Sequence, residues 1–180
     1  MGVSLRSLRQ PYDVVSAPVE QPARPTLALA APVHGSAYAL SDSPYALDRL
    51  YTHGVGVYQI PRSARLFVPY RCILLHVTPD RSAWVFALNN HLHLRIEIRS
   101  AQPLPHVFSQ VAMGQVLKQG EHFAQLHHAL INPETMVVTT VHQVTVENPE
   151  HAVPHYLALS QSGEMRASED LVLQLYLLDS

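Results

Sequence analysis

The sequence predicts an all-β fold, an antiparallel β-sandwich or jelly roll of about eight to ten strands with an extended, proline-rich N-terminal arm. From residue 51 onward, short runs rich in Val, Leu, Ile, Phe and Tyr alternate with Pro, Gly, Asn and Asp, which is typical of strands and turns. Only residues 43–51 suggest a helical turn, in which Ser43 would cap and Pro44 would take the first helical position. Because no helices separate the strands, a parallel doubly wound sheet is excluded.

Residues 1–48 differ in composition from the rest of the chain. They hold six of the 14 prolines, yet they carry too many apolar side chains for a freely solvated tail. We expect them to form an arm that lies on a neighbouring subunit or across its own body, with residues 49–180 as the sandwich domain. Leu27 and Leu29, in "PTLALAAP", are expected contact residues of an added edge strand. The alternative is a disordered leader over the first 25 residues.

Ten runs predict the strands of the body. They are residues 55–60, 65–70, 72–78, 83–88, 92–99, 107–113, 122–130, 136–147, 154–160 and 171–178, with turns at 78–81 and 147–151. The last run is apolar on both faces apart from Gln174. It is therefore expected to be central in its sheet or covered by a partner.

The composition favours self-association. Only 14% of the residues are charged, against about 25% in typical soluble domains, and the net charge is −2. Every basic residue except Lys118 is an arginine. Because interfaces are poor in Lys, Glu and Asp but keep Arg, we expect a homodimer or homotrimer; a monomer coated with neutral polar groups is the alternative.

Other partners and compartments are not indicated. The lack of a basic excess argues against direct binding of nucleic acid. No apolar run approaches the length of a membrane span, and no signal peptide is recognisable at the start. The only cysteine, Cys72, lies in an apolar run and is expected to be buried and unpaired.

The stretch "NNHLHLRIEIRS", residues 89–100, alternates polar and apolar side chains from His91 to Arg99. Successive side chains of a strand point to opposite faces, so one face of this strand is apolar and must be the core. The other face predicts the open surface of a sheet or a subunit contact, on which Glu97, between Arg95 and Arg99, is expected to take part in ion pairs across strands. The expected interface residues on it are His91, His93, Arg95, Glu97 and Arg99.

The spacing of His91, His93 and Glu97, with His128 further on, resembles the metal-binding motifs of the cupins. The resemblance implies a barrel that binds Fe, Mn or Zn through these four residues. The glycine that leads the first cupin motif is absent, as is the Pro-x-Gly turn of the second. Arg95 and Arg99 would also enter the barrel beside a divalent cation, which charge repulsion disfavours. We therefore expect no metal and no other cofactor, and keep a cupin-type metal-dependent enzyme or small-molecule-binding barrel as the alternative.

The chain has 12 histidines, and those outside the cupin-like motif do not predict a metal or catalytic site. His127 and His128 are adjacent, so on a regular strand they would point to opposite faces. His142 falls on the apolar face of its strand and is expected to be a core or interface histidine. Histidines at interfaces could make assembly sensitive to pH between about 5 and 7. No nucleophile elbow, phosphate-binding loop or paired-cysteine motif occurs, so an enzyme is not expected.

The arm, the β body, the low charge and the apolar last strand together resemble the small jelly-roll or β-sandwich proteins that build or decorate virus and phage capsids. The resemblance implies a structural virion protein, a capsid or capsid-decoration subunit that is assembled in the host cytoplasm. Its partners would be copies of itself and other capsid subunits, held together by sheet faces and the arm. A third possibility, a trimeric head like those of complement-type or tumour-necrosis-type domains, shares the sandwich but would be expected to carry a secretion signal.

Overall fold

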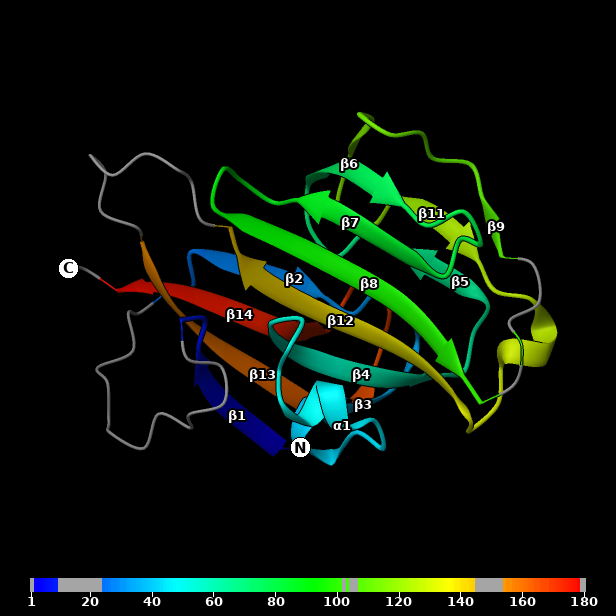
Figure 1. Cartoon of the computed structure of the whole chain (residues 1–180), viewed down its shortest axis with the longest axis horizontal. Helices are drawn as coiled ribbons and strands as arrows, with labels where there is room; N and C mark the ends of the chain where they lie inside the picture. Colours follow the sequence, from blue (N-terminus) through cyan, green and yellow to red (C-terminus); the bar gives the residue numbers. More distant parts are fainter. Residues whose placement is uncertain (1, 10–23, 102, 104–106, 145–153, 179–180) are drawn as a thin grey trace.

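The fold is almost entirely β, in a computed structural model that describes residues 2–9, 24–101, 103, 107–144 and 154–178 (Figure 1). The strands are β1 (Gly2–Ser7), β2 (Leu27–Ala30), β3 (Gly35–Ala39), β4 (Val55–Pro61), β5 (Arg65–Phe67), β6 (Cys72–Val77), β7 (Ala83–Ala87), β8 (Leu92–Ser100), β9 (Phe108–Ser109), β10 (Val116–Leu117), β11 (His122–Gln125), β12 (Thr135–Gln143), β13 (His155–Met165) and β14 (Leu171–Leu178). The helical elements are short: η1 (Leu40–Asp42), α1 (Ala46–Arg49) and η2 (His128–Leu130).

The strands form one large sheet and one small one. The large sheet has the order β10-β6-β7-β8-β12-β4-β3-β13-β14-β2, and β1 pairs with β13. The small sheet has the order β5-β11-β9. The pairings within both sheets are antiparallel. The predicted all-β fold class is therefore confirmed, in the form of curled antiparallel sheets that make a half-barrel or sandwich.

The large sheet curls so that its β2 edge meets the segment around β5. The amide of Ala30 donates to the carbonyl of Pro69 at 3.0 Å, and the amide of Phe67 donates to the carbonyl of Pro32 at 2.8 Å. Both prolines act only as hydrogen-bond acceptors here, through their carbonyl groups, so their lack of an N–H does not interrupt the contact. The curl brings segments far apart in sequence onto one core.

The core lies between the curled faces. The inward side of β8 (Leu92, Leu94, Ile96, Ile98) is at most 2% exposed, so the predicted alternation along this strand is confirmed. Trp84 on β7 packs edge-on against Phe123 on β11, with 5.3 Å between the ring centroids. Phe86 meets the same ring at 5.5 Å. These aromatic contacts join the large sheet to the small one.

The predicted strands are correct where the chain stays in the ladder of the large sheet and too long elsewhere. The runs at 55–60, 72–78, 83–88, 92–99 and 171–178 match strands to within about two residues. The runs at 65–70, 107–113 and 122–130 shrink to β5, β9 and β11, because the chain turns out of the ladder within each of them. The last strand, β14, is central as expected, between β13 and β2. The turn at 147–151 lies outside the described residues.

The N-terminal residues also contribute strands. β1 and β3 pair with β13, and β2 pairs with β14, so the described parts of residues 1–48 hydrogen-bond to strands of the body. The division of the chain into an arm and a domain at residue 48 stays a prediction, and much of the expected arm, residues 10–23, lies outside the described residues.

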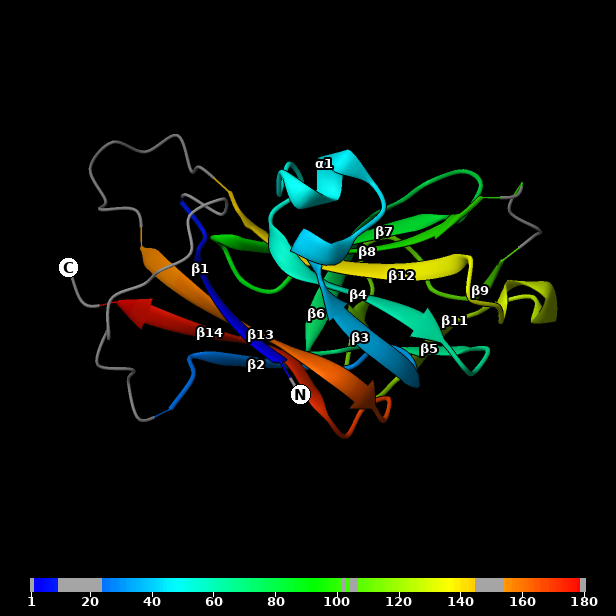
Figure 2. The same ribbon diagram turned by 90° about the horizontal axis from the view of Figure 1, so that it is seen from below.

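Residues 40–53 form a short helical segment on one side of the large sheet. Figure 2 shows α1 on one side of β4 and β12, with β13, β14 and β2 on the other. The expected helix start is wrong by two residues, since Tyr45 rather than Ser43 is the N-cap, and Tyr45 makes no side-chain cap bond. Ser43 instead accepts a hydrogen bond from the Tyr45 amide at 3.2 Å and donates to Asp48 at 2.7 Å.

Candidate docking face and histidine pair

The outward face of β8 lies beside small or apolar residues of its two neighbours. Glu97 is opposite Val138 on β12 and Ala83 on β7, and Arg95 is opposite Thr140 and Val85. The expected ion pairs between strands are therefore wrong, because neither neighbouring strand presents a charge there. The charges pair along β8 itself.

The Glu97 carboxylate lies between two guanidinium groups of its own strand. Arg95 Nη2 is 3.0 Å from Glu97 Oε2, and Arg99 Nε is 3.1 Å from Glu97 Oε1. Burial alone would raise the pKa of Glu97, but the hydrogen bonds and positive charges of Arg99 and Arg95 outweigh it and hold this pKa below its usual value. Glu97 is thus held ionised as part of a fixed ladder of charges.

Arg99 extends this ladder to the helical segment. Its guanidinium pairs with the carboxylate of Asp48, whose side chain is only 2% exposed. Burial alone would lower the pKa of Arg99, but its hydrogen bonds to Glu97 and Asp48 raise it. Its guanidinium carbon also lies 5.4 Å from the ring centroid of Tyr45. A buried ion pair and a cation–π contact therefore fasten the α1 turn onto β8.

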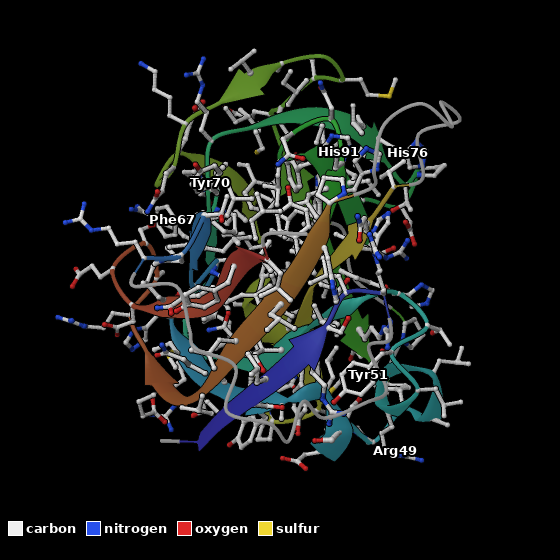
Figure 3. The ribbon with its side chains drawn as sticks, turned by 90° about the vertical axis from the view of Figure 1, so that its left-hand side faces the viewer. Arg49, Tyr51, Phe67, Tyr70, His76 and His91 are labelled. Carbon is white, nitrogen blue, oxygen red and sulfur yellow. The ribbon has the colours of Figure 1, made fainter. Side chains whose placement is uncertain are left out.

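The outer side of the α1 turn exposes apolar side chains. Leu47 is 57% exposed, Leu50 is 63% exposed and Tyr45 is 36% exposed. Figure 3 shows Arg49 projecting outward from the same turn and Tyr51 turned toward the body. We call Tyr45, Leu47 and Leu50, with the charged side chains Arg95, Glu97 and Arg99, the docking face.

Two histidines meet at the far end of the same strand. His93 on β8 is opposite His142 on β12, and their rings are perpendicular with centroids 5.5 Å apart. Burial lowers the pKa of His93. Burial lowers the pKa of His142 as well, and the electrostatic effects of His93, Arg95 and His53 lower it further. The neutral form of both imidazoles is therefore favoured at pH 7.

The residues of the cupin-like motif are not gathered into a metal site. His91, His93 and Glu97 lie along one face of β8, or just before it, whereas His128 lies in the separate helical turn η2. Within the described ranges, no group of three or more His, Cys, Asp and Glu could hold a metal ion. The expectation for His127 and His128 is wrong in its geometry: they are not on a strand, so their rings do not point apart but lie 4.0 Å from each other.

The other predicted residues are buried within this chain. Leu27 is 6% exposed and Leu29 is fully buried, both in the core cluster, so the described contacts of these two expected interface residues are internal. Cys72 is buried and free, as expected. Its burial, together with the charge of Glu121, raises the pKa of the thiol to about 12.

Sequence reasoning missed the residues that complete the docking face. Asp48 appears as one acidic residue in a short turn, and nothing local shows that its partner lies on β8. Leu47 and Leu50 are three residues apart and so share one side of the turn, but the sequence does not indicate whether that side faces the core or the solvent. His142 was assigned to an apolar face, while its register with β8 places it against His93.

None of the helices among the described residues is long and apolar enough to cross a membrane. No family model matches the sequence, and no curated protein is significantly similar to it. Among solved structures, glucose permease IIA from Mycoplasma capricolum is similar with a TM-score of 0.61. The match covers 82% of this chain and 94% of that chain at 16% identity, so the two share a fold.

This comparison overturns the expected function. The prediction of a virion protein is wrong, because the matching fold is that of a permease component and not of a capsid protein. The predicted capsid, decoration and bacteriophage roles, and the predicted lack of enzymatic activity, are wrong for the same reason. The cupin-type enzyme is not supported either. The physical reason is that an all-β body with few charges and an apolar last strand is common to several architectures, and only the strand order distinguishes them. The chain is similar in fold to glucose permease IIA over most of its length.

Proposed function

We propose that this chain is a component of a sugar-uptake system that works by binding a partner protein through the docking face. The carrying observation is that Leu47 and Leu50 are exposed on a turn that a buried ion pair, Arg99 to Asp48, holds in place. Protein interfaces combine an apolar centre and arginines with a polar margin, and a preordered surface loses little entropy on binding. The fold shared with glucose permease IIA supports the choice of system.

The composition of the docking face fits this role. Aromatic and arginine side chains dominate the binding energy of protein interfaces, and Tyr45 stacked under Arg99 offers both. The charges around it are already paired with each other along β8, so covering them does not leave a lone buried ion. A partner can therefore bury Leu47 and Leu50 without a large cost for desolvating the charged side chains of the docking face.

The test combines a transport assay with a single charge in the docking face. In cells that lack this protein, uptake of labelled sugar should be restored by the wild-type chain and by Met113→Asp, but not by Leu47→Asp. Met113 is the matched control, because it is 66% exposed in a turn outside the docking face. Equal rescue by both variants would contradict the proposal.

Light scattering on the same variants decides whether the partner is a second copy. If the wild-type chain is a dimer or trimer and Leu47→Asp is a monomer, the docking face is a self-contact and the heterologous partner is ruled out. If the mass is the same for both variants, the docking face is not a self-contact, and the transport assay alone decides whether another protein of the uptake system binds it.

A second candidate function rests on the histidine pair. A neutral imidazole is a nucleophile, and Arg95 lies close enough to raise the positive potential at His142. A phosphoryl group fits such a site: the imidazole nitrogen would form a P–N bond, the P–O bond of the donor would break, and the guanidinium would offset the added charge.

This second candidate is tested with acetyl phosphate as the donor and acetate as the leaving group. Acid-labile phosphate should appear on the wild-type chain and disappear in His93→Ala or His142→Ala. His76→Ala is the control, because His76 lies on β6, away from the pair. No incorporation in the wild-type chain would exclude the role.

A further inference from the structure

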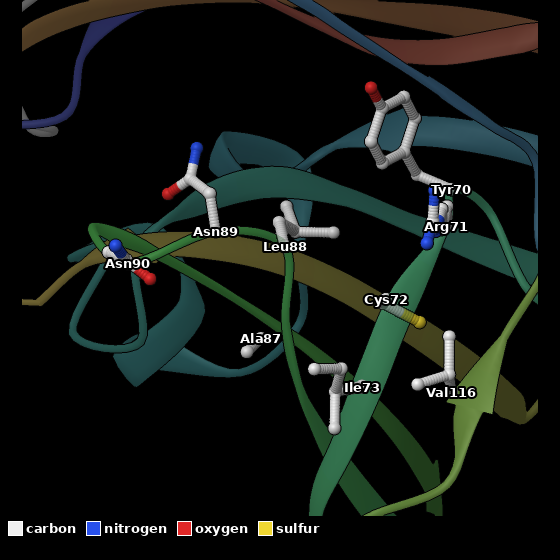
Figure 4. A pocket seen from close by; sticks show the side chains of 9 residues that line it. All are labelled: Tyr70, Arg71, Cys72, Ile73, Ala87, Leu88, Asn89, Asn90 and Val116. Carbon is white, nitrogen blue, oxygen red and sulfur yellow. The ribbon is translucent and has the colours of Figure 1, made fainter.

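A cavity of about 420 Å³ opens between the ends of β6, β7 and β10. Its lining includes Arg71, Cys72, Ile73, Asn89 and Val116. Figure 4 shows Tyr70 and Arg71 on one side of the opening, Leu88 with Asn89 and Asn90 on the other, and Ile73 and Val116 at its base. The volume lies in the range of small-molecule sites, which run from about 300 to 1,000 Å³.

The polar groups of this cavity are mainly donors. The side-chain oxygen of Asn89 is already occupied, because it accepts from the amides of His91 at 2.8 Å and Leu92 at 2.9 Å. The amide NH₂ of Asn89 is what it can offer a ligand. Arg71 has only donors, and none of the lining residues is acidic. Among the described residues, no ion pair engages the Arg71 guanidinium.

The remaining wall is apolar and partly uncovered. Ile73 is 42% exposed and Val116 is 54% exposed, whereas neighbouring Leu74 and Leu117 are fully buried. The Cys72 thiol contributes another nonpolar surface, because a pKa of about 12 keeps it protonated. The cavity therefore presents positive donors beside an exposed hydrophobic wall.

We propose that this cavity binds a small organic anion, a molecule with a carboxylate or phosphate group on an apolar or ring-shaped body. The anionic group pairs with Arg71 and receives a hydrogen bond from Asn89, and the body covers Ile73 and Val116. The cavity and the docking face share no residues, so this site stands independently of the proposed docking function.

Isothermal titration calorimetry of the full chain with phenyl phosphate tests the site, since this probe combines both chemical parts. Inorganic phosphate and phenol, which carry one part each, should bind at least about tenfold more weakly. Arg71→Gln should weaken phenyl phosphate by about tenfold and leave phenol unchanged. Arg81→Gln is the matched control, because Arg81 lies in the turn at the opposite end of the β6–β7 hairpin.

A second variant keeps the test decisive if Arg71→Gln does not fold. Val116→Glu changes a half-exposed side chain and places a carboxylate at the base of the cavity, so it should repel phenyl phosphate. Saturable binding that both variants lower establishes the site. No saturable binding to the wild-type chain, or equal binding by wild type and both variants, overturns the proposal.

Discussion

Arg99 pairs with Asp48 across 51 residues of sequence, and this contact fixes the only α-helical turn of the described residues to the outer face of β8. The Asp48 side chain is 2% exposed, and Ser43 is its other hydrogen-bond partner. Such a pair is costly to break from one side, because the remaining charge stays buried without compensation.

Arg99→Met is therefore expected to lower the free energy of unfolding by about 3–5 kcal/mol. The loss should be smaller in the double variant Arg99→Met with Asp48→Asn, since the uncompensated charge is then gone. Urea denaturation measures both. Arg62→Met serves as the control, because Arg62 and Glu164 form an ion pair with side chains 60% and 57% exposed, and its loss should cost less than about 1 kcal/mol. Equal losses for Arg62→Met and Arg99→Met would contradict the burial argument.

The histidine pair predicts that acid destabilises the fold. The pKa values of His93 and His142 are lowered in the folded chain, so the unfolded chain binds more protons just below the ordinary histidine pKa. The free energy of unfolding should consequently fall as the pH drops from about 6.5 through the lowered values. Charged groups facing the pair are Arg95 on β8 and His53 before β4, and both add to the repulsion when the imidazoles are protonated.

His142→Gln should flatten this dependence, as seen in urea denaturation at a series of pH values. Glu97 titrates separately, because its lowered pKa moves its own contribution to a more acidic range. An unchanged slope above pH 5 in His142→Gln would show that the pair does not control it.

The close contact between β4 and β12 predicts that adding one methyl group at Gly56 strongly lowers the stability of the fold. A Cβ added at Gly56 on β4 would lie 1.9 Å from the carbonyl oxygen of Thr139 on β12. Gly56→Ala should therefore destabilise the fold by about 1–3 kcal/mol or more, because the central β4–β12 ladder must separate. Gly114→Ala is the comparison, since nothing lies within 4 Å of the added atom and only its backbone φ of +82° opposes the change. Thermal unfolding followed by circular dichroism would rank the two, and a larger loss at Gly114 would contradict the packing explanation.

Cys72 predicts slow thiol chemistry in the folded chain. Burial raises its pKa to about 12, and the reactive form is the thiolate. Alkylation by iodoacetamide at pH 8 should therefore be far slower in the native chain than in urea. Fast labelling of the native chain, measured by mass spectrometry, would mean that the β6 edge opens readily.

Local patterns in the sequence were sufficient to predict features that depend on a single strand. The alternation of Leu92, Leu94 and Ile96 with polar residues correctly identified the buried side of β8. The low density of charges, by contrast, does not distinguish one β architecture from another, so the capsid resemblance failed. Strand order depends on long-range pairing that no local pattern encodes.

The site followed the same division. Glu97, Arg95 and Arg99 were recognised as residues that form ion pairs, but the pairs were expected across strands and lie along β8, because Val138 and Ala83 are opposite Glu97. Asp48 belongs to the site through a tertiary contact with Arg99, and His142 through the register of β12 against β8. Neither the contact nor the register can be deduced from the sequence of 180 residues.

The edge-on packing of Trp84 against Phe123 has a practical consequence. Trp84 is the only tryptophan of the chain, it is fully buried, and its ring spans the junction between the large and small sheets. Its fluorescence is therefore a built-in optical probe of that junction: a red shift of the emission marks the moment when water enters between the two layers. Compared with the backbone circular dichroism signal, it would reveal whether the layers part before the strands themselves melt.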